Sequence, residues 1–300
     1  MQSAWRRIHT ILALMFFRFA AKGWLPARWF EPDLPPLADR AAREGRLTIE
    51  IVSHCWQYSH FLVYQLSSLV NFPPQSVDVI MTVFYCPEDE GTRRLLSYFE
   101  QKTPPNVTWN WWPVERRRLF RRGIGRNHAA LATNADWVWF TDCDLMFREN
   151  CFEELGEQLQ GRRDALLFPS EERVTELLAE DNPMLSAGSG EPQVLDIADE
   201  SFTPHYPSRA TGPLQIAHGD VCRAVGYCRR IGLYQQPVDT FAKCHEDRAF
   251  RWLIRSQGVA VDVPGVYRIR HVAKGRYSGS EANTRLRTLI RRWQDKWGSR

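Results

Sequence analysis

Apolar runs typical of strands alternate with helix-like segments through the middle of the chain, and this alternation constrains the fold most. Four runs are rich in β-branched and aromatic residues, at 47–53, 77–85, 106–112 and 137–141. Helices are expected between them, at about 58–70, 90–100 and 124–134. This order is typical of right-handed βαβ units, so we expect an α/β fold with a mostly parallel central sheet covered by helices.

The two ends of the chain differ from this central part. Four prolines between residues 26 and 36 predict a stiff connector. We therefore divide the chain into an N-terminal segment at 1–45, a folded domain at 46–281 and a C-terminal segment at 282–300. The stretch 181–213 is rich in Pro, Gly, Ser and acidic residues, and is expected to form a long loop.

Charge is distributed unevenly between these parts. Residues 1–28 carry five Lys or Arg and no acid, while residues 282–300 carry six and one acid. Because the whole chain has a net charge of +4, the part between the two ends has a net charge of −6. This pattern disfavours a nucleic-acid groove and favours basic ends that meet an anionic surface.

The N-terminal segment contains an apolar run at 11–17, with Arg6 and Arg7 before it and Arg18 after it. A membrane-spanning helix needs about 20 apolar residues, so this run is too short. Large residues stand where a signal peptide needs small ones. We predict an interfacial helix with aromatic anchors, and the alternative is a helix that covers the domain's own core. The anchors would be Trp5, Phe16, Phe17 and Trp24.

The C-terminal segment has its apolar residues on one helical face and basic residues on the rest. It predicts an amphipathic helix that lies either on anionic lipid or on the domain. The chain also has seven cysteines with no CxxC spacing. We interpret them as reduced, mostly buried thiols of a cytoplasmic protein.

Two acidic residues follow the apolar run at 137–141. Alternation along an extended chain points Asp142 and Asp144 to the same side. Carboxylate oxygens there suit Mg²⁺ or Mn²⁺, which prefer carboxylate and phosphate ligands. Acids are also common in turns after strands, so this pair alone is a weak signal.

The segment 126–144, RNHAALATNADWVWFTDCD, resembles family 2 of the inverting glycosyltransferases with the GT-A fold. The resemblance covers roughly residues 47–271 and implies a three-layer α/β/α nucleotide-sugar domain. It implies that Asp144 holds the divalent metal, that Asp142 contacts the metal or the ribose of the donor, and that Arg126 and Asn127 lie at the donor nucleotide. The implied donor is a nucleotide-diphosphate sugar, with a UDP-sugar favoured.

Two later segments fit the same resemblance. The stretch 212–220 ends in Gly219 and Asp220, which would border the donor sugar, although Asp220 is equally suited to cap the next helix. Glu246 and Asp247 open a helix that is expected to run to Gly258, and the helix dipole alone would stabilise them there. The resemblance implies that Asp247 deprotonates the acceptor hydroxyl and that Glu246 orients the acceptor.

Four more residues complete the expected site. His271 is a candidate third metal ligand, with a structural histidine as the alternative. Ser53, Tyr85 and Glu88 follow the first two strands, where the family contacts the donor nucleotide. The residues at these two strand ends depart from the family pattern.

The function expected from these residues is a metal-dependent, hexosyltransferase-type reaction with inversion. The Gln-x-x-Arg-Trp signature of processive synthases is absent, which favours single addition. The acceptor would be a glycan or lipid-linked glycan of the cell envelope, at the inner face of a membrane. The alternatives are a catalytically silent nucleotide-binding scaffold with the same fold, and a nucleotidyltransferase.

Overall fold

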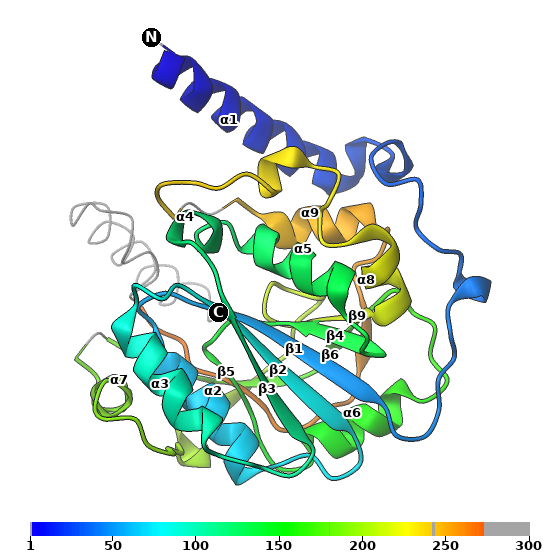
Figure 1. Ribbon diagram of the computed structural model, residues 1–300. Helices are drawn as coiled ribbons and strands as arrows, with labels where there is room; N and C mark the ends of the chain where they lie inside the picture. The colour runs from blue at the N-terminus through cyan, green and yellow to red at the C-terminus, as the bar shows by residue number, and fades with distance from the viewer. Residues whose placement is uncertain (1, 180, 242–243, 273–300) are drawn as a thin grey trace.

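The computed structural model describes residues 2–179, 181–241 and 244–272 of the 300-residue chain (Figure 1). Its centre is a seven-stranded sheet with the strand order β10-β6-β9-β4-β1-β2-β3. The strands are β1 (Thr48–Cys55), β2 (Asp78–Tyr85), β3 (Val107–Pro113), β4 (Trp137–Phe140), β6 (Leu166–Pro169), β9 (Gln215–His218) and β10 (Val259–Val261).

One strand of this sheet runs against the others. β1 pairs in parallel with β2 and β4, β2 pairs in parallel with β3, and β10 pairs in parallel with β6. β9 is antiparallel to both of its neighbours, β4 and β6. The expected α/β fold with a mostly parallel central sheet is therefore confirmed.

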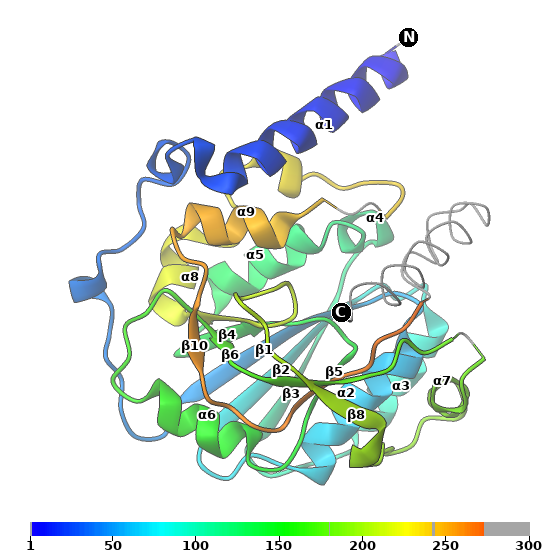
Figure 2. The ribbon, with the colours of Figure 1, turned by 180° about the vertical axis from the view of Figure 1, so that it is seen from behind.

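Helices cover both faces of the sheet, which makes three layers (Figures 1 and 2). One face carries α2 (Ser59–Asn71), α3 (Glu90–Glu100) and α6 (Cys151–Leu159). The other face carries α4 (Arg116–Leu119), α5 (Arg122–Ala132), α8 (Gly219–Val225) and α9 (Glu246–Leu253). The first four strands and the helices α2, α3 and α5 lie where the sequence pattern predicted them. All seven cysteines are buried, as expected.

A second sheet lies beside the first and has the order β5-β11-β7-β8. Its strands are β5 (Leu145–Phe147), β7 (Glu172–Thr175), β8 (Phe202–His205) and β11 (Val266–Arg268). The stretch 181–213, which was expected to be a loop, contains β8, the helix α7 (Pro183–Gly188) and the short turn η4 (Asp199–Ser201). β8 pairs with β7 in antiparallel register, from Glu172↔His205 to Thr175↔Phe202, and this pairing gives residues 202–205 a regular structure.

The N-terminal segment forms α1 (Gln2–Phe19) and the short helices η1 (Ala20–Trp24), η2 (Ala27–Trp29) and η3 (Leu37–Asp39). It is more than a connector, because the Trp252 indole of α9 donates to the Leu25 carbonyl at 3.0 Å. Arg230 also forms an ion pair with Glu31 at 3.1 Å. Among the residues that the structure describes, no helix is long and apolar enough to span a membrane. The predicted C-terminal amphipathic helix lies outside the described residues.

Two details of the helix ends, at α8 and α9, were predicted wrongly. At α6, Asn150 precedes the helix with a left-handed backbone (φ 62°) and no side-chain cap hydrogen bond, and Glu153 accepts from the Gln75 amide. α8 is capped by His218, whose ring nitrogen accepts from the Asp220 amide. α9 ends at Leu253, before Gly258, because Arg255 takes the left-handed conformation (φ 55°).

The helix α8 packs very closely on the central sheet at Gly219, its first residue. Its amide donates to the Asp136 carbonyl at 2.8 Å, and a Cβ there would lie 2.3 Å from the Ala135 carbonyl oxygen. Glycine is therefore required by the packing of α8 against the segment that precedes β4.

We expect Gly219→Ala to lower the free energy of unfolding by about 1–3 kcal/mol, because backbone atoms must move to admit the methyl group. Urea unfolding measures this, with Gly232→Ala as the control, since the nearest atom to a Cβ at Gly232 is 4.0 Å away. Equal unfolding midpoints for the two variants would contradict the expected packing.

Candidate functional site

The candidate site lies where the chain reverses its direction of travel across the sheet. From β1 the chain moves outward to β2 and β3, and then returns to β4 on the other side of β1. In open α/β sheets, ligands bind beyond the carboxyl ends of the strands at such a point. The residues that follow β4 there are Thr141 to Asp144.

Two arginines of α5 hold the first carboxylate of this loop. Asp142 Oδ1 accepts a hydrogen bond from Arg122 Nη1 and another, at 3.3 Å, from Arg126 Nη2. The Asp142 carbonyl also accepts from the Gln65 amide group at 3.1 Å. Asp142 is therefore fixed by charge and by its backbone before any ligand is considered.

Arg122 also reaches the second acidic pair. Its Nη2 lies 3.1 Å from Glu246 Oε1, and its Nε donates to the same oxygen at 3.2 Å. One guanidinium thus ties the loop after β4 to the start of α9. The sequence analysis missed Arg122, although its position one helical turn before Arg126 places both arginines on one face of α5.

Glu246 is a buried anion whose other oxygen is also engaged. It is 2% exposed, and Oε2 accepts from the Cys244 thiol at 2.8 Å. Burial opposes the ionisation of Glu246, but Arg122 and Arg126 outweigh it and lower its pKa to about 2. Glu246 therefore serves to hold the site together as a permanent charge.

Asp247, the next residue, is in a different environment. Its side chain is 27% exposed, and it forms a long ion pair, 3.5 Å, with Arg251. Its backbone carbonyl accepts from Gln215 Nε2 at 3.1 Å, and a Cβ at Gly212 would lie 3.9 Å from its own Cβ. Asp247 thus presents a partly exposed carboxylate beside the loop that leads into β9.

Arg126 organises the centre of the site from a fully buried position. Besides Asp142, it donates to the Thr141 carbonyl at 3.1 Å, the Gly212 carbonyl at 3.3 Å and the Tyr227 hydroxyl at 2.9 Å. The Tyr227 hydroxyl in turn donates to Gln215 Oε1 at 2.8 Å. The sequence analysis singled out Arg126 but missed Tyr227 and Gln215, which lack any motif.

Asn127, predicted to lie at the donor nucleotide, makes a structural contact within the fold. Its Oδ1 accepts from the Tyr227 amide at 3.0 Å. A Cβ at the preceding Gly226 (φ 65°) would lie 2.3 Å from that oxygen. Asn127 therefore fixes the turn after α8 that carries Tyr227.

Asp144 and His271 come together through the second sheet. β11 is antiparallel to β5, and the Ile269 amide continues this pairing by donating to the Asp144 carbonyl at 2.9 Å. His271 Nε2 then lies 3.6 Å from Asp144 Oδ2, and both residues are almost fully buried. The His271 ring packs against Phe61 with 4.1 Å between centroids.

The donor set at this pair suits a divalent metal. One carboxylate oxygen and one imidazole nitrogen of the kind that Mn²⁺ accepts already face one another. Among the described residues, no group of three His, Cys, Asp or Glu side chains is arranged to hold a metal. Asp142, the predicted second carboxylate ligand, is paired with two arginines. Asp144 and His271 are thus the two protein ligands that fit.

Gly219 and Asp220 are not brought to this site. Trp137, the first residue of β4, pairs with His218, so the end of β9 lies at the amino end of β4. The Asp220 carboxylate there accepts from the Ala41 amide at 2.7 Å and from Arg223 at 2.6 Å. Because β9 is antiparallel to β4, its start at Gln215 lies beside Phe140 at the carboxyl end of β4, and its end does not.

The strand-end residues predicted to meet the nucleotide are spread out. Ser53 is completely buried, Tyr85 is half-buried at the end of β2, and Glu88 is exposed and 3.4 Å from Arg116. Its neighbour Asp89 is a buried cap that accepts from Thr92 and from the Gln57 amide. Tyr85 and Glu88 are therefore accessible to solvent, whereas Ser53 lies inside the fold.

His54 is a further residue of this region that the sequence did not predict. Its ring stacks on Phe84, with centroids 5.0 Å apart, and a Cβ at Gly125 of α5 would lie 2.2 Å from its Nε2. Burial, with Arg126 and Arg122 nearby, lowers the pKa of His54 well below its usual value. A neutral imidazole thus lies beneath the two arginines and adds no further positive charge.

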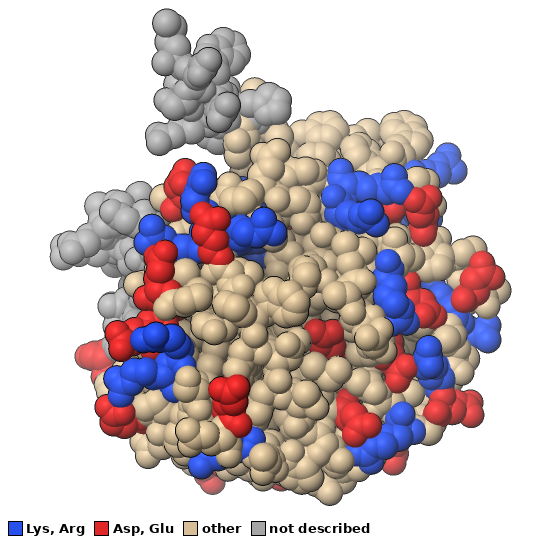
Figure 3. Space-filling model, viewed as in Figure 1, with Lys and Arg blue, Asp and Glu red and all other residues tan. Residues whose placement is uncertain are grey.

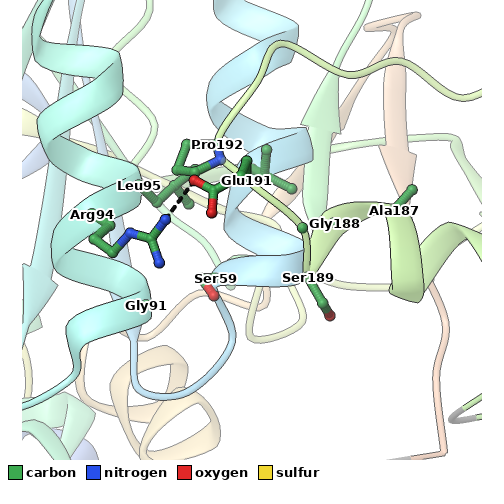
Figure 4. Close-up of a pocket in the computed structure, with 11 residues that line it drawn as sticks. Ser59, Gly91, Arg94, Leu95, Ala187, Gly188, Ser189, Glu191 and Pro192 are labelled. Atoms are coloured by element: carbon green, nitrogen blue, oxygen red, sulfur yellow. Dashed lines mark hydrogen bonds and ion pairs between the residues drawn. The ribbon is translucent and has the colours of Figure 1, made fainter.

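A separate small hollow lies between α2, α3 and the end of α7 (Figure 4). Its volume is about 80 Å³, and Arg94 and Glu191 form an ion pair across it. Sites for drug-sized ligands have volumes of roughly 300–1,000 Å³, so this hollow is too small for a nucleotide sugar. It does not include the carboxylates described above.

The chain was compared with known proteins. No family model matches it, and no curated protein sequence matches it. Among solved structures, it is similar to the mannosyltransferase PcManGT from Pyrobaculum calidifontis in complex with GDP-Man and Mn²⁺. The identity is 16% and the TM-score 0.43, and the alignment covers 90% of this chain and 67% of that one. These values are too low to assign a function.

The charge network predicts a pH dependence of stability. Because the pKa of Glu246 is lower in the folded chain than its ordinary value of 4.5, its contribution is present above pH 4.5 and is lost as the pH falls toward 2. We expect the free energy of unfolding of wild type to exceed that of Glu246→Gln by on the order of 3 kcal/mol near neutral pH. The difference should become progressively smaller in acid.

Urea unfolding of both proteins over a range of pH values measures this difference. Glu88→Gln is the control, because its ion pair with Arg116 is at the surface and is worth about 1 kcal/mol or less. A difference between wild type and Glu246→Gln that stays constant with pH would show that Glu246 is not held as a buried anion.

Proposed function

We propose that this chain is a glycosyltransferase that moves a sugar from a nucleotide-diphosphate donor to an acceptor hydroxyl, with inversion. The observation that carries the proposal is the single guanidinium of Arg122 that joins Asp142 to Glu246. It brings the two acidic pairs, from the loop after β4 and from the start of α9, to one edge of the sheet. Two such carboxylate stations, at the switch point where open α/β sheets bind ligands, suit donor and acceptor binding.

On the donor side, Asp144 and His271 would hold a divalent metal, Mn²⁺ or Mg²⁺. When bound, such an ion offsets the negative charge of a diphosphate leaving group. Asp142 would not ligate it directly, because Arg122 and Arg126 already neutralise its carboxylate. We assign Asp142 and Arg126 to holding the loop in the position that contacts the nucleotide.

On the acceptor side, the two neighbouring acids differ in what they can do. Glu246 is buried, and both of its oxygens are engaged by Arg122 and Cys244. Asp247 is partly exposed and has a carboxylate that a hydroxyl can reach. We therefore assign the general base to Asp247 and a positioning role to Glu246.

The reaction follows from this division. Asp247 accepts the hydroxyl proton while the acceptor oxygen attacks the anomeric carbon, and the bond from that carbon to the diphosphate breaks. One displacement on the face opposite the leaving group inverts the anomeric centre. A UDP-sugar donor and a glycan or lipid-linked acceptor remain the favoured substrates.

The test is to incubate the protein with a panel of UDP- and GDP-sugars, Mn²⁺ and a membrane extract. Nucleotide release and sugar transfer are then measured.

We expect Asp247→Asn to lower kcat by about 10²–10⁴-fold, because the amide cannot accept the hydroxyl proton. Nucleotide binding, measured by calorimetry, should change little. The matched control is Asp239→Asn, an exposed carboxylate paired with Arg117 at the surface. Full activity of Asp247→Asn would exclude it as the base.

We expect Asp144→Asn and His271→Ala each to weaken Mn²⁺-dependent nucleoside diphosphate binding by at least about tenfold. Calorimetry with Mn²⁺ and with EDTA measures the metal-dependent part. Asp262→Asn, at an exposed position, is the control. If all variants bind the nucleoside diphosphate tightly, and wild type neither transfers the sugar nor hydrolyses the donor, the silent scaffold is favoured instead.

A further inference from the structure

The apolar side chains of α1 form an exposed stripe. Leu12, Met15, Phe16 and Phe19 are spaced three and four residues apart, which places them on one face of the helix. They are 60%, 62%, 46% and 51% exposed, respectively. A surface helix of a globular protein normally turns such a face toward the core.

The stripe continues beyond the end of the helix. Gly23 takes a left-handed conformation (φ 94°) and turns the chain, and the Trp24 ring then stacks on Phe19 with centroids 5.4 Å apart. Trp24 and Trp29 are 69% and 67% exposed. We call Leu12, Met15, Phe16, Phe19, Trp24 and Trp29 the N-terminal apolar surface. In the described part of the chain, it holds six of the eleven large hydrophobic side chains that are exposed.

The opposite side of α1 already packs on the domain. Phe17 lies against Phe30 and Tyr234, with centroids 6.0 Å and 6.2 Å apart. Phe30 packs on Trp252 of α9 at 4.9 Å. The fold therefore has one face of α1 for its own core, and the N-terminal apolar surface is a different face. Phe16 lies at the border of the two, 46% exposed and with its ring centroid 6.4 Å from that of Phe30.

The charged residues within 1–28, which carry five of the six side chains of this surface, are all basic. The acids that follow, Glu31 and Asp33, are both paired with Arg230. Arg18, Lys22 and Arg28 are exposed, and residues 1–28 contain no acid. Figure 3 shows a largely uncharged area over the end of α1, with both basic and acidic side chains beside it. Exposed tryptophans next to basic residues are typical of a surface that lies at a lipid headgroup boundary. A second copy of the chain would instead bring like charges together.

We propose that the N-terminal apolar surface docks on an anionic lipid membrane, with the apolar side chains below the headgroups and Arg18, Lys22 and Arg28 among them. Docking needs no part of the transfer reaction and stands independently of the proposed function. Since Trp252 joins this segment to α9, the membrane would lie on the same side of the domain as the helix that begins with Glu246 and Asp247.

The experiment is co-sedimentation of the full chain with vesicles of phosphatidylcholine, alone or mixed with phosphatidylglycerol. We expect at least about tenfold tighter binding to the mixed vesicles, weakened by salt. Trp24→Glu should weaken that binding at least about tenfold. Tyr206→Glu is a matched control, because Tyr206 is also 69% exposed but lies far along the chain, after β8. It should bind as wild type does.

Three results would overturn the proposal. The first is that wild type does not bind the anionic vesicles, and the second is that Trp24→Glu and Tyr206→Glu bind them equally. The third is a dimer in sedimentation velocity that Trp24→Glu alone dissociates, which would assign the surface to a second copy. Nucleotide binding is measured on the same proteins, so failure of docking is distinguishable from failure of the transferase proposal.

Discussion

The arginine pair of α5 is the interaction on which the rest of the site depends. Arg122 and Arg126 face Asp142 and Glu246, so two positive and two negative charges meet in a region of low exposure. Burying charges is tolerated only when they are paired and hydrogen-bonded, and removal of one partner typically costs 3–5 kcal/mol. The pairing therefore fixes α5, the loop after β4 and α9 relative to one another.

Two further features go with this pairing. The first is that His54, beneath the arginines, is neutral, so it adds no positive charge to the two that the acids balance. The second is that neighbouring acids become unequal: Glu246 is buried and engaged on both oxygens, while Asp247 keeps an accessible carboxylate. The division of labour between these two residues is set by their surroundings, since their chemistry is the same.

The same segments link the site to the N-terminal part of the chain. α9 begins with the two acids, and its Trp252 holds the turn after α1 through the Leu25 carbonyl. The exposed stripe of α1 is thus attached to the acceptor side of the proposed site by direct packing. A membrane at that stripe would suit a lipid-linked acceptor, which connects the two proposals without making either depend on the other.

Local patterns of apolar residues were sufficient to predict the α/β fold, the first four strands and three of the helices, and the resemblance of the segment 126–144 pointed to Arg126. Tertiary structure decided the rest. Nothing local shows that β9 runs antiparallel, which removes Gly219 and Asp220 from the site and brings in Gly212. Pairing of β5 with β11, together with the bridge between Leu178 and His271, places His271 beside Asp144, more than a hundred residues away in sequence. Partners of a buried charge come from distant segments, so only the folded chain reveals that Arg122 joins the two acidic pairs.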